Sequence, residues 1–416
     1  VSALPVIAPI TGPDSVCVGH TINLSEATAG GSWLSNNSGI ATISSGGLVT
    51  GISEGSVRIS YTVINAAGCS DSVSKTIVVS ALPVIAPITG PDSVCVGHTI
   101  NLSEVTAGGS WLSNNSGIAT ISSGGLVTGI SAGTVRISYT VINAAGCSDS
   151  VSKTIVVSAL PVIAPITGPD SVCVGHTINL SEATSGGSWL SNNSGIATIS
   201  SGGLVTGISA GTVRISYTVI NAAGCSDSVS KTIIVSALPV IAPITGPDSV
   251  CVGHTINLSE ATAGGSWLSN NSGIATISSG GLVTGISEGS VRISYTVINA
   301  AGCSDSVSKT IVVSALPVIA PITGPDSVCV GHTINLSEVT AGGSWLSNNS
   351  GIATISSGGL VTGISAGTVR ISYTVINAAG CSDSVSKTIV VSALPVIAPI
   401  TGPDSVCVGH TINLSE

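Results

Sequence analysis

The 416-residue sequence contains no Phe and no Met, and only 7% of its residues carry a formal charge. Its longest apolar stretch, residues 77–88, is interrupted by Ser80, Pro83 and Pro87, so it is too short and too broken to span a bilayer. The ten Lys and Arg residues are spread evenly and form no basic stripe for nucleic acid. The sequence therefore predicts no membrane span in this segment and no nucleic-acid partner.

The residue patterns of known catalytic and metal centres are also missing. His20 has no His, Cys or carboxylate at ligand spacing within its own strand, which favours a solvent-facing His over a metal ligand. Asp14, Glu26 and Asp71 form no D-x-D-x-D loop, so calcium between domains stays open but unsupported. No G-x-S-x-G turn or phosphate-binding glycine loop occurs. We expect no catalytic residue, no cofactor and no metal, hence a protein that is not an enzyme.

What the sequence does have is a long repeat, present in five nearly identical copies followed by the first third of a sixth. The copies begin at Val1, Val79, Val157, Val235, Val313 and Val391. At the few variable positions copy four matches copy one and copy five matches copy two, so a three-unit block has itself been duplicated. A shaft gains length with each copy, whereas an enzyme seldom needs five identical active sites in a row. The predicted domains are residues 1–80, 81–158, 159–236, 237–314 and 315–392, with a partial sixth repeat at 393–416.

Each repeat has the residue pattern of a β-sandwich. Branched aliphatic residues favour strands, glycines favour turns, and no segment shows a helical period. Residues 6–10 are expected to form an edge strand, because an edge tolerates Pro5 and Pro9. The fold class is therefore all-β, a tandem array of small immunoglobulin-like sandwiches. The remaining strands of the first repeat are expected at 15–18, 21–25, 32–34, 40–43, 48–50, 56–64 and 73–79.

Every complete repeat carries two cysteines. Paired cysteines in so small a unit indicate disulfides and an oxidising compartment, although buried thiols in a cytosolic protein remain the alternative. Cys407 is left over. The predicted disulfide cysteines are Cys17, Cys69, Cys95, Cys147, Cys173, Cys225, Cys251, Cys303, Cys329 and Cys381.

The residues allow two pairings of these cysteines. We favour Cys17 with Cys69 inside one repeat, which closes a loop worth about 4 kcal/mol in the chain-entropy model. The alternative joins Cys69 to Cys95 across a junction and leaves Cys17 as the odd residue. The two pairings differ in whether cleavage between repeats releases separate fragments.

Trp33 and Tyr61 are the two aromatic residues of the first repeat. Trp33 lies inside an expected strand beside Leu34, so we predict that Trp33 and Tyr61 centre the core. A surface Trp that stacks on sugar rings is the alternative interpretation.

The segment 33–43, WLSNNSGIATI, continues into GLVTGI at 47–52 and Gly55. It resembles the bacterial immunoglobulin-like group 2 domain, which implies a small β-sandwich, usually in tandem arrays on surface adhesins of the intimin and invasin type. The cysteine pair departs from that pattern. Val16-Cys17-Val18-Gly19 and Ala67-Gly68-Cys69 resemble instead the Cys-bearing repeats of very large Bacteroidetes surface proteins, which implies export by a gliding-associated route and puts invasin-like receptor binding in doubt.

Two short patterns bear on modification. Asp14-Ser15-Val16 and Asp71-Ser72-Val73 resemble the D-[ST]-aliphatic pattern for O-glycosylation in Bacteroidetes, which makes Ser15 and Ser72 candidate sites. Asn23-Leu24-Ser25 and Asn36-Asn37-Ser38 match the eukaryotic N-glycosylation sequon, which the bacterial origin implied by the resemblance would make irrelevant.

The repeats follow one another without a flexible linker, and Pro83 and Pro87 stiffen the first junction. We therefore expect a semi-rigid rod at the bacterial cell surface, the shaft or filament segment of a large secreted protein that extends an adhesive tip. Its partners are the neighbouring repeats and, in a filament, other copies. The alternatives are a multivalent array that binds glycan or a neighbouring chain, and a subunit that self-assembles through the 6–10 edge.

Overall fold

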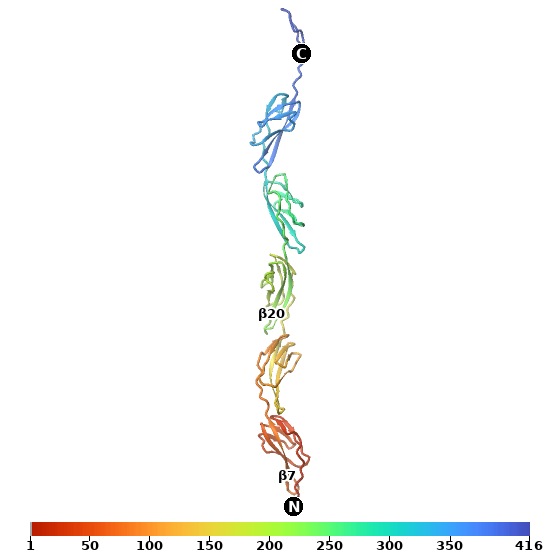
Figure 1. Cartoon of the computed structure of the whole chain (residues 1–416), viewed down its shortest axis with the longest axis vertical. Coiled ribbons are helices and arrows are strands. Elements are labelled where there is room, and N and C mark those ends of the chain that lie inside the picture. The colour runs from red at the N-terminus through yellow and green to blue at the C-terminus, as the bar shows by residue number, and fades with distance from the viewer. Residues whose placement is uncertain (1) are drawn as a thin grey trace. The chain divides into compact units, whose positions relative to one another are not determined.

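A computed structural model describes residues 2–416, and none of these residues lies in a helix. The chain is all-β and consists of five β-sandwich repeats with the same seven strands, followed by the partial sixth (Figure 1). Its residue contacts divide it into two units. The first comprises the residues up to Asp170 with Thr177–Ile208 and Thr212–Ile234, and the second comprises Ser171–His176, Ser209–Gly211 and Val235–Glu416.

The strands of the first repeat are β1 (Ser15–Cys17), β2 (Thr21–Asn23), β3 (Ser32–Ser35), β4 (Ala41–Ile43), β5 (Leu48–Gly51), β6 (Gly55–Ile64) and β7 (Ser70–Ser80). Those of the second are β8 (Ser93–Cys95), β9 (Thr99–Asn101), β10 (Ser110–Ser113), β11 (Ala119–Ile121), β12 (Leu126–Gly129), β13 (Gly133–Ile142) and β14 (Ser148–Ser158). Those of the third are β15 (Ser171–Cys173), β16 (Thr177–Asn179), β17 (Ser188–Ser191), β18 (Ala197–Ile199), β19 (Leu204–Gly207), β20 (Gly211–Ile220) and β21 (Ser226–Ser236).

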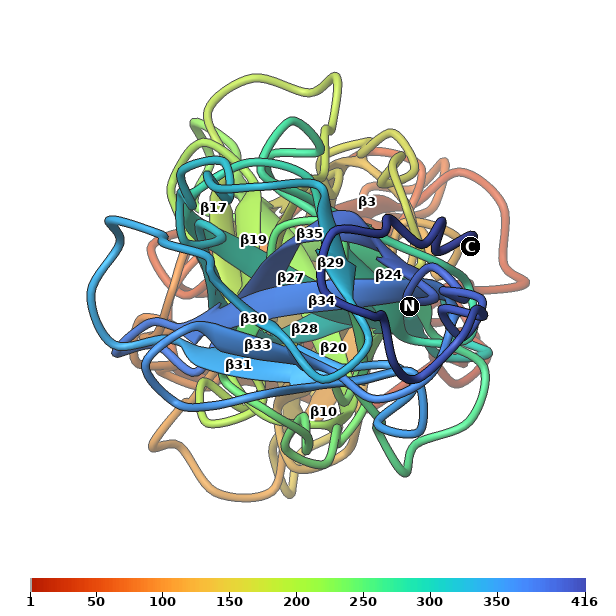
Figure 2. The same cartoon turned by 90° about the horizontal axis from the view of Figure 1, so that it is seen from above.

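Those of the fourth are β22 (Ser249–Cys251), β23 (Thr255–Asn257), β24 (Ser266–Ser269), β25 (Ala275–Ile277), β26 (Leu282–Gly285), β27 (Gly289–Ile298) and β28 (Ser304–Ser314). Those of the fifth are β29 (Ser327–Cys329), β30 (Thr333–Asn335), β31 (Ser344–Ser347), β32 (Ala353–Ile355), β33 (Leu360–Gly363), β34 (Gly367–Ile376) and β35 (Ser382–Ser392), several of which are labelled in Figure 2.

Two sheets make each sandwich. In the first repeat one sheet has the order β1-β7-β6-β3 and the other the order β2-β5-β4. Neighbouring strands pair antiparallel with one exception: β1 runs parallel to β7. The parallel pairing follows from the order of the strands, because β1 comes first in the repeat and adds to the strand that comes last.

The long hairpin β6–β7 shows why the sequence folds this way. Val57, Ile59, Tyr61 and Val63 alternate with polar residues along β6, and all four are buried. They meet buried residues of the smaller sheet, such as Ala41 and Val49, in one apolar cluster. Period-two alternation thus places every second residue of β6 in the core, and Ile77 and Val79 join them from the end of β7.

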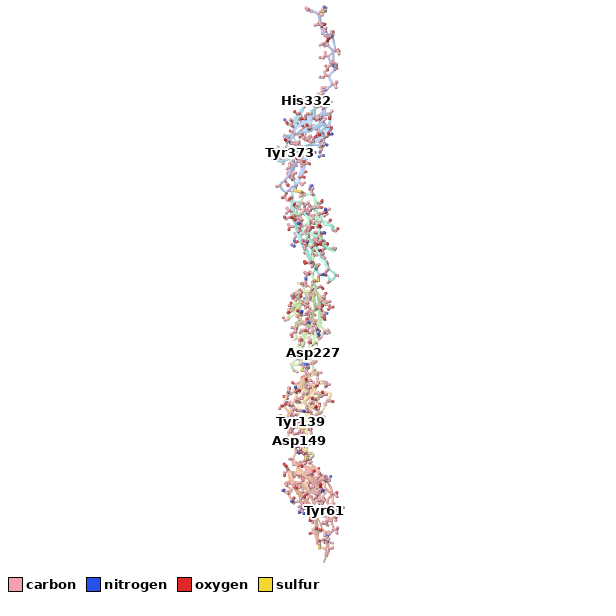
Figure 3. All side chains as sticks on the ribbon, in the orientation of Figure 1. Tyr61, Tyr139, Asp149, Asp227, His332 and Tyr373 are labelled. Carbon is pink, nitrogen blue, oxygen red and sulfur yellow. A yellow bond between two sulfur atoms is a disulfide. The ribbon has the colours of Figure 1, made fainter. Side chains whose placement is uncertain are left out.

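Trp33 and Tyr61 face each other across β3 and β6, with ring centroids 4.8 Å apart and planes tilted by 57°. Tyr61 is buried, whereas Trp33 is half-buried and packs against the edge of the cluster. The Tyr61 hydroxyl donates to the carbonyl of Thr28 (2.8 Å) and accepts from the amide of Gly31 (2.9 Å). Tyr61, Tyr139 and Tyr373, labelled in Figure 3, make equivalent bonds in their own repeats.

The edge strand predicted at 6–10 is wrong. Residues 2–10 form no strand, and the first backbone pairing is the isolated bridge between Thr11 and Ser25. Pro5 and Pro9 remove two amides from any ladder, and the Ala8 amide donates instead to the Thr28 hydroxyl (3.1 Å). The edges of the larger sheet are β1 and β3.

Candidate functional site: the disulfide at each junction

One disulfide joins each complete repeat to the next, which makes four disulfides in the five complete repeats. They are Cys17–Cys147, Cys95–Cys225, Cys173–Cys303 and Cys251–Cys381, and each pair is separated by 130 residues in sequence. In every case the first cysteine of one repeat is bonded to the second cysteine of the following repeat. The Cα atoms are 5.6–5.7 Å apart, within the normal range for a disulfide. The same covalent bond therefore recurs along the chain.

The direction of β1 places Cys17 at the junction. Because β1 is parallel to β7, its last residue lies beside the last residue of β7, and Cys17 pairs in register with Ser80. The Val18 amide donates to the Ser80 carbonyl (3.0 Å). Ser80 is followed directly by the residues that lead into the second repeat, so Cys17 lies where the chain leaves the first.

A tight loop before β14 presents the other sulfur. The Asn143 side chain accepts from the amides of Ala145 (3.1 Å) and Cys147 (3.0 Å), and it donates to the carbonyl of Ala81 (2.8 Å). The Cys147 Sγ lies 3.8 Å from the Ser80 carbonyl oxygen. Asn143 thus fastens the loop to the first residues of its own repeat, and Cys147 comes to face Cys17 across the junction.

We call this arrangement the junction clamp: the disulfide, the Ser80 carbonyl and the Asn143 side chain with their counterparts. The fastening asparagines of the other clamps are Asn221, Asn299 and Asn377, which donate to Ala159, Ala237 and Ala315. Sequence reasoning missed the asparagine and the serine. The signal was the recurring N-A-A-G-C segment, in which an Asn four residues before a Cys can cap the turn with its side chain.

The predicted pairing of Cys17 with Cys69 is wrong, and so is the alternative of Cys69 with Cys95. Cys69 directly precedes β7, whereas Cys17 lies at the far end of the same 11-residue strand. At the rise of an extended strand the two ends are about 35 Å apart, far beyond the reach of a disulfide. Cys95, the last residue of β8, pairs in register with Ser158 at the end of the second repeat and is bonded to Cys225.

Cys69, Cys329 and Cys407 are not bonded to another cysteine in residues 2–416, so the expectation of a disulfide at Cys69 and Cys329 is not met within this segment. The loop around Cys69 nevertheless has the geometry of the bonded ones. The Asn65 side chain accepts from the Cys69 amide (3.0 Å) and donates to the Ala3 carbonyl (2.9 Å). The loop therefore takes its shape without the disulfide.

Hollows open on the surface beside two of the clamps. One of about 340 Å³ is lined by Glu54, Val78 and Ala145, among others, and one of about 420 Å³ by Glu288, Val312 and Ala379. The position of Glu54 and Glu288 is occupied by alanine in the other complete repeats: Ala132, Ala210 and Ala366. These hollows therefore carry a carboxylate at the first and fourth repeats.

An ion pair fastens the first strand of each complete repeat to its sheet. Lys75 on β7 pairs with Asp14, directly before β1, and the Asp14 carbonyl accepts from the Val78 amide (2.9 Å). Equivalent pairs join Lys153 to Asp92, Lys231 to Asp170, Lys309 to Asp248 and Lys387 to Asp326. The aspartates are largely exposed, so each pair contributes little free energy and mainly fixes position.

The other predicted site residues lie apart from the clamp or on its exposed side. Ser15 on β1 and Ser72 on β7 are both exposed. His20 is exposed, and one ring nitrogen lies 3.2 Å from the Val18 carbonyl. No group of three or more His, Cys, Asp or Glu residues that could hold a metal occurs in residues 2–416. Within the same residues no helix is long and apolar enough to cross a membrane.

The outer face of the smaller sheet carries a row of threonines. Thr21, Thr50 and Thr42 are adjacent across β2, β5 and β4. Thr21 and Thr42 are exposed, and Thr50 is half-buried. The row recurs at Thr99, Thr128 and Thr120, at Thr177, Thr206 and Thr198, at Thr255, Thr284 and Thr276, and at Thr333, Thr362 and Thr354.

No protein-family model matches the chain. A curated relative is Ice-binding protein 1 of Shewanella frigidimarina, strain NCIMB 400, which is 24% identical over 415 residues. The alignment covers 89% of this chain and 45% of that protein, so the chain spans less than half of the relative's length.

Similar solved structures include the human desmocollin-1 ectodomain, with 11% identity, 94% of this chain and 99% of that chain covered, and a TM-score of 0.20. Insect hemolin has 14% identity, 75% and 100% coverage and a TM-score of 0.20. Domains 1–6 of the surface-layer protein SbsC have 14% identity, 92% and 66% coverage and a TM-score of 0.17. The immunoglobulin-like sandwich rests on the strand pairing of this chain, since TM-scores this low add nothing to it. Four disulfides fit an extracellular protein.

Proposed function

We propose that the chain is a structural shaft or filament segment of a secreted bacterial surface protein, with no catalytic role. The observation that carries the proposal is the recurrence of one clamp, with the same disulfide and the same asparagine, at successive junctions. A binding array on flexible linkers has no use for covalent junctions, whereas a shaft that transmits force does. The neighbouring repeats are the partners that this role requires.

The finer assignment follows from the same proposal. The resemblance of the Cys-bearing repeat to those of giant Bacteroidetes surface adhesins supports a location at the bacterial cell surface. A shaft of this kind holds an adhesive domain, encoded elsewhere in the protein, away from the cell. The disulfides support the oxidising compartment that such a location supplies.

Small-angle scattering on chains of different repeat number tests the shaft. Deleting residues 81–158 removes one whole repeat with its two cysteines, so every remaining cysteine keeps an equivalent position relative to its neighbours. A shaft loses a constant increment of maximum dimension with each repeat removed, about 40 Å from the rise of an 11-residue strand and its turn. A maximum dimension that does not change with repeat number contradicts the proposal.

A binding array is the second candidate, and the threonine row favours it. Five copies of Thr21–Thr50–Thr42 present hydroxyl and methyl groups at the regular spacing of neighbouring strands, about 4.8 Å. Such a row suits an ordered solid surface, and the relative named for ice binding makes ice the first to test. Because weak sites multiply by avidity, five copies can act together where one does not.

Partition into slowly growing ice decides between the two candidates. An array that binds ice is enriched in the frozen fraction, and replacing the exposed Thr42 and its four counterparts with Lys abolishes the enrichment. The matched control replaces Thr76, exposed on the outer face of the other sheet, and its counterparts. If the array binds ice, the control keeps the enrichment, whereas a shaft is not enriched in the frozen fraction in any of the three forms.

A further inference from the structure

The pairing of the cysteines, more than their number, determines how far the chain can be stretched. The bridge from Cys17 leads to Cys147 and bypasses the residues between them, because the pair is 130 residues apart in sequence. The next cysteine on this route, Cys173, is bonded to Cys303. A covalent path thus runs from Cys17 to Cys303 through only one short stretch of backbone, residues 147–173.

The backbone on such a path has little slack. The equivalent stretch from Cys69 to Cys95 contains the 11 residues of the extended strand β7 and the 3 residues of β8. Between these strands lie residues 81–92, which include Pro83, Pro87 and Pro91; prolines hold their own φ and keep the preceding residues extended. Since extended strands rise about 3.3 Å per residue and a stretched chain at most about 3.6 Å, most of this backbone is already near its full length.

A second covalent path uses the other two bridges. It runs from Cys95 to Cys225, along the backbone to Cys251, and across to Cys381. The two paths share no bridge. The first path crosses the first and third junctions by disulfides, and the second path crosses the second and fourth. Between them they bridge the four junctions of the five complete repeats.

We infer that the alternating disulfides form two covalent cables, which make the spans from Cys17 to Cys303 and from Cys95 to Cys381 inextensible under load while the chain is oxidised. Most residues of the sandwiches lie outside the covalent route that bears the load, so unfolding of a sandwich releases almost no length within these spans. Reduction removes the limit and turns the same chain into an extensible one. This inference deepens the proposed structural role and rests on it for biological meaning, whereas the mechanical property is measured without it.

Single-molecule stretching of the full chain tests the cables. Handles are attached at Pro13 and Ala301, both exposed and close to Cys17 and Cys303. In the oxidised protein the covalent route between the handles contains about 32 residues and two bridges, so extension ends near about 120 Å even at forces that unfold sandwiches. After reduction the route contains about 290 residues and reaches about 1,000 Å, a roughly eightfold increase.

Two variants of equal cysteine content separate the cables. Replacing Cys17 and Cys147 together by Ser forces the route through Cys95–Cys225 and lengthens the oxidised limit to about 500 Å. Replacing Cys95 and Cys225 by Ser removes a bridge from the same span but not from the route, and the limit stays at about 120 Å. These limits are set by covalent bonds, so they hold whether or not a variant's sandwiches are fully folded.

Other pairings give other lengths. Bridges within each repeat, such as Cys17–Cys69, give an oxidised limit of about 300 Å and overturn the inference, as does equal lengthening in both double variants. A thiol titration before stretching verifies oxidation, and three free thiols are expected, at Cys69, Cys329 and Cys407. A count of eleven free thiols, which means that no disulfide forms, also overturns the inference. If only the shaft role fails, scattering shows it while the oxidised limit of about 120 Å persists.

Discussion

Cys17 and Cys147 are bonded across the junction between the first and second repeats, 130 residues apart in the chain. Closing a loop of that length restricts the unfolded chain by about 5 kcal/mol in the chain-entropy model. The loop of the next bridge, from Cys95 to Cys225, begins inside the first loop and ends outside it. Each repeat is therefore stabilised through its neighbours, and the loops interlock instead of lying in series.

Cleavage between repeats is expected to leave the chain in one piece. A protease site inserted at Val84, which is 92% exposed, allows a cut just past the first junction. Cys17–Cys147 is the bridge that crosses this cut, because Cys95 and Cys225 both lie on its far side. Gel electrophoresis without reductant should show one band after the cut, and two bands with reductant.

The variant with Ser at both Cys17 and Cys147 is the control for that cut. It has no bridge across Val84 and should separate into two fragments even without reductant. Release of the small fragment from the unmodified chain without reductant would instead indicate bridges inside the repeats.

Asn143 is expected to protect its disulfide. Asn143→Ala removes one hydrogen bond to Ala81 and two to the loop amides, so the loop that carries Cys147 loosens. At about 1 kcal/mol for each bond lost, local opening should become at least tenfold more frequent. Reduction of Cys17–Cys147 by a thiol should accelerate accordingly, as measured by alkylation and mass spectrometry of the cysteine peptides.

The same chain contains the reference for that experiment. Cys173–Cys303 has an equivalent loop, fastened by Asn299, which the substitution does not touch. Its rate of reduction should not change. Equal rates at the two bridges would mean that the Asn143 side chain does not limit access to the disulfide.

Most strands could be predicted from the sequence because alternation and turn residues act locally. The hairpin β6–β7 is the plainest case: apolar residues at every second position and a glycine-containing turn specify both strands. The edge strand at 6–10 failed for a related reason. Its apolar residues look like a strand, but the decisive contact is the Ala8 amide with Thr28, which is 20 residues away.

The disulfide register could not be predicted because it depends on one long-range pairing. Only the parallel alignment of β1 with β7 places Cys17 beside Ser80, and nothing local in Ser15–Cys17 distinguishes a parallel from an antiparallel neighbour. The candidate cysteines were identifiable from their recurrence, whereas their partners required the topology of two consecutive repeats. The role of Asn143 could not be predicted for the same reason, because its hydrogen bond to Ala81 joins residues 62 positions apart.

Gly31 is expected to tolerate no side chain. A Cβ at this position would lie 2.4 Å from the ring of Tyr61, whose hydroxyl also accepts from the Gly31 amide. Alanine must displace the ring and should cost about 1–3 kcal/mol in each repeat where it is introduced. Substituting all five equivalents, Gly31, Gly109, Gly187, Gly265 and Gly343, should lower the urea midpoint of the full chain.

Gly46→Ala with its four counterparts is the control for crowding. A Cβ there would come no closer than 3.9 Å to the Ser44 hydroxyl, and Gly46 has no positive φ. Its effect on the urea midpoint should be small. Equal shifts in the two sets would show that loss of glycine flexibility, and not contact with Tyr61, determines the cost.

Ser15 and Ser72 are expected to carry O-linked glycan in protein isolated from its source. Both are exposed, both follow an aspartate, and glycans at either position would leave the apolar cluster undisturbed because their neighbours Val16 and Val73 point inward. Ser74, exposed on the same strand but preceded by Val73, is the internal control. Peptide mass spectrometry should find sugar on Ser15, Ser72 and their counterparts and none on Ser74. Unmodified serines throughout would contradict the resemblance on which this prediction depends.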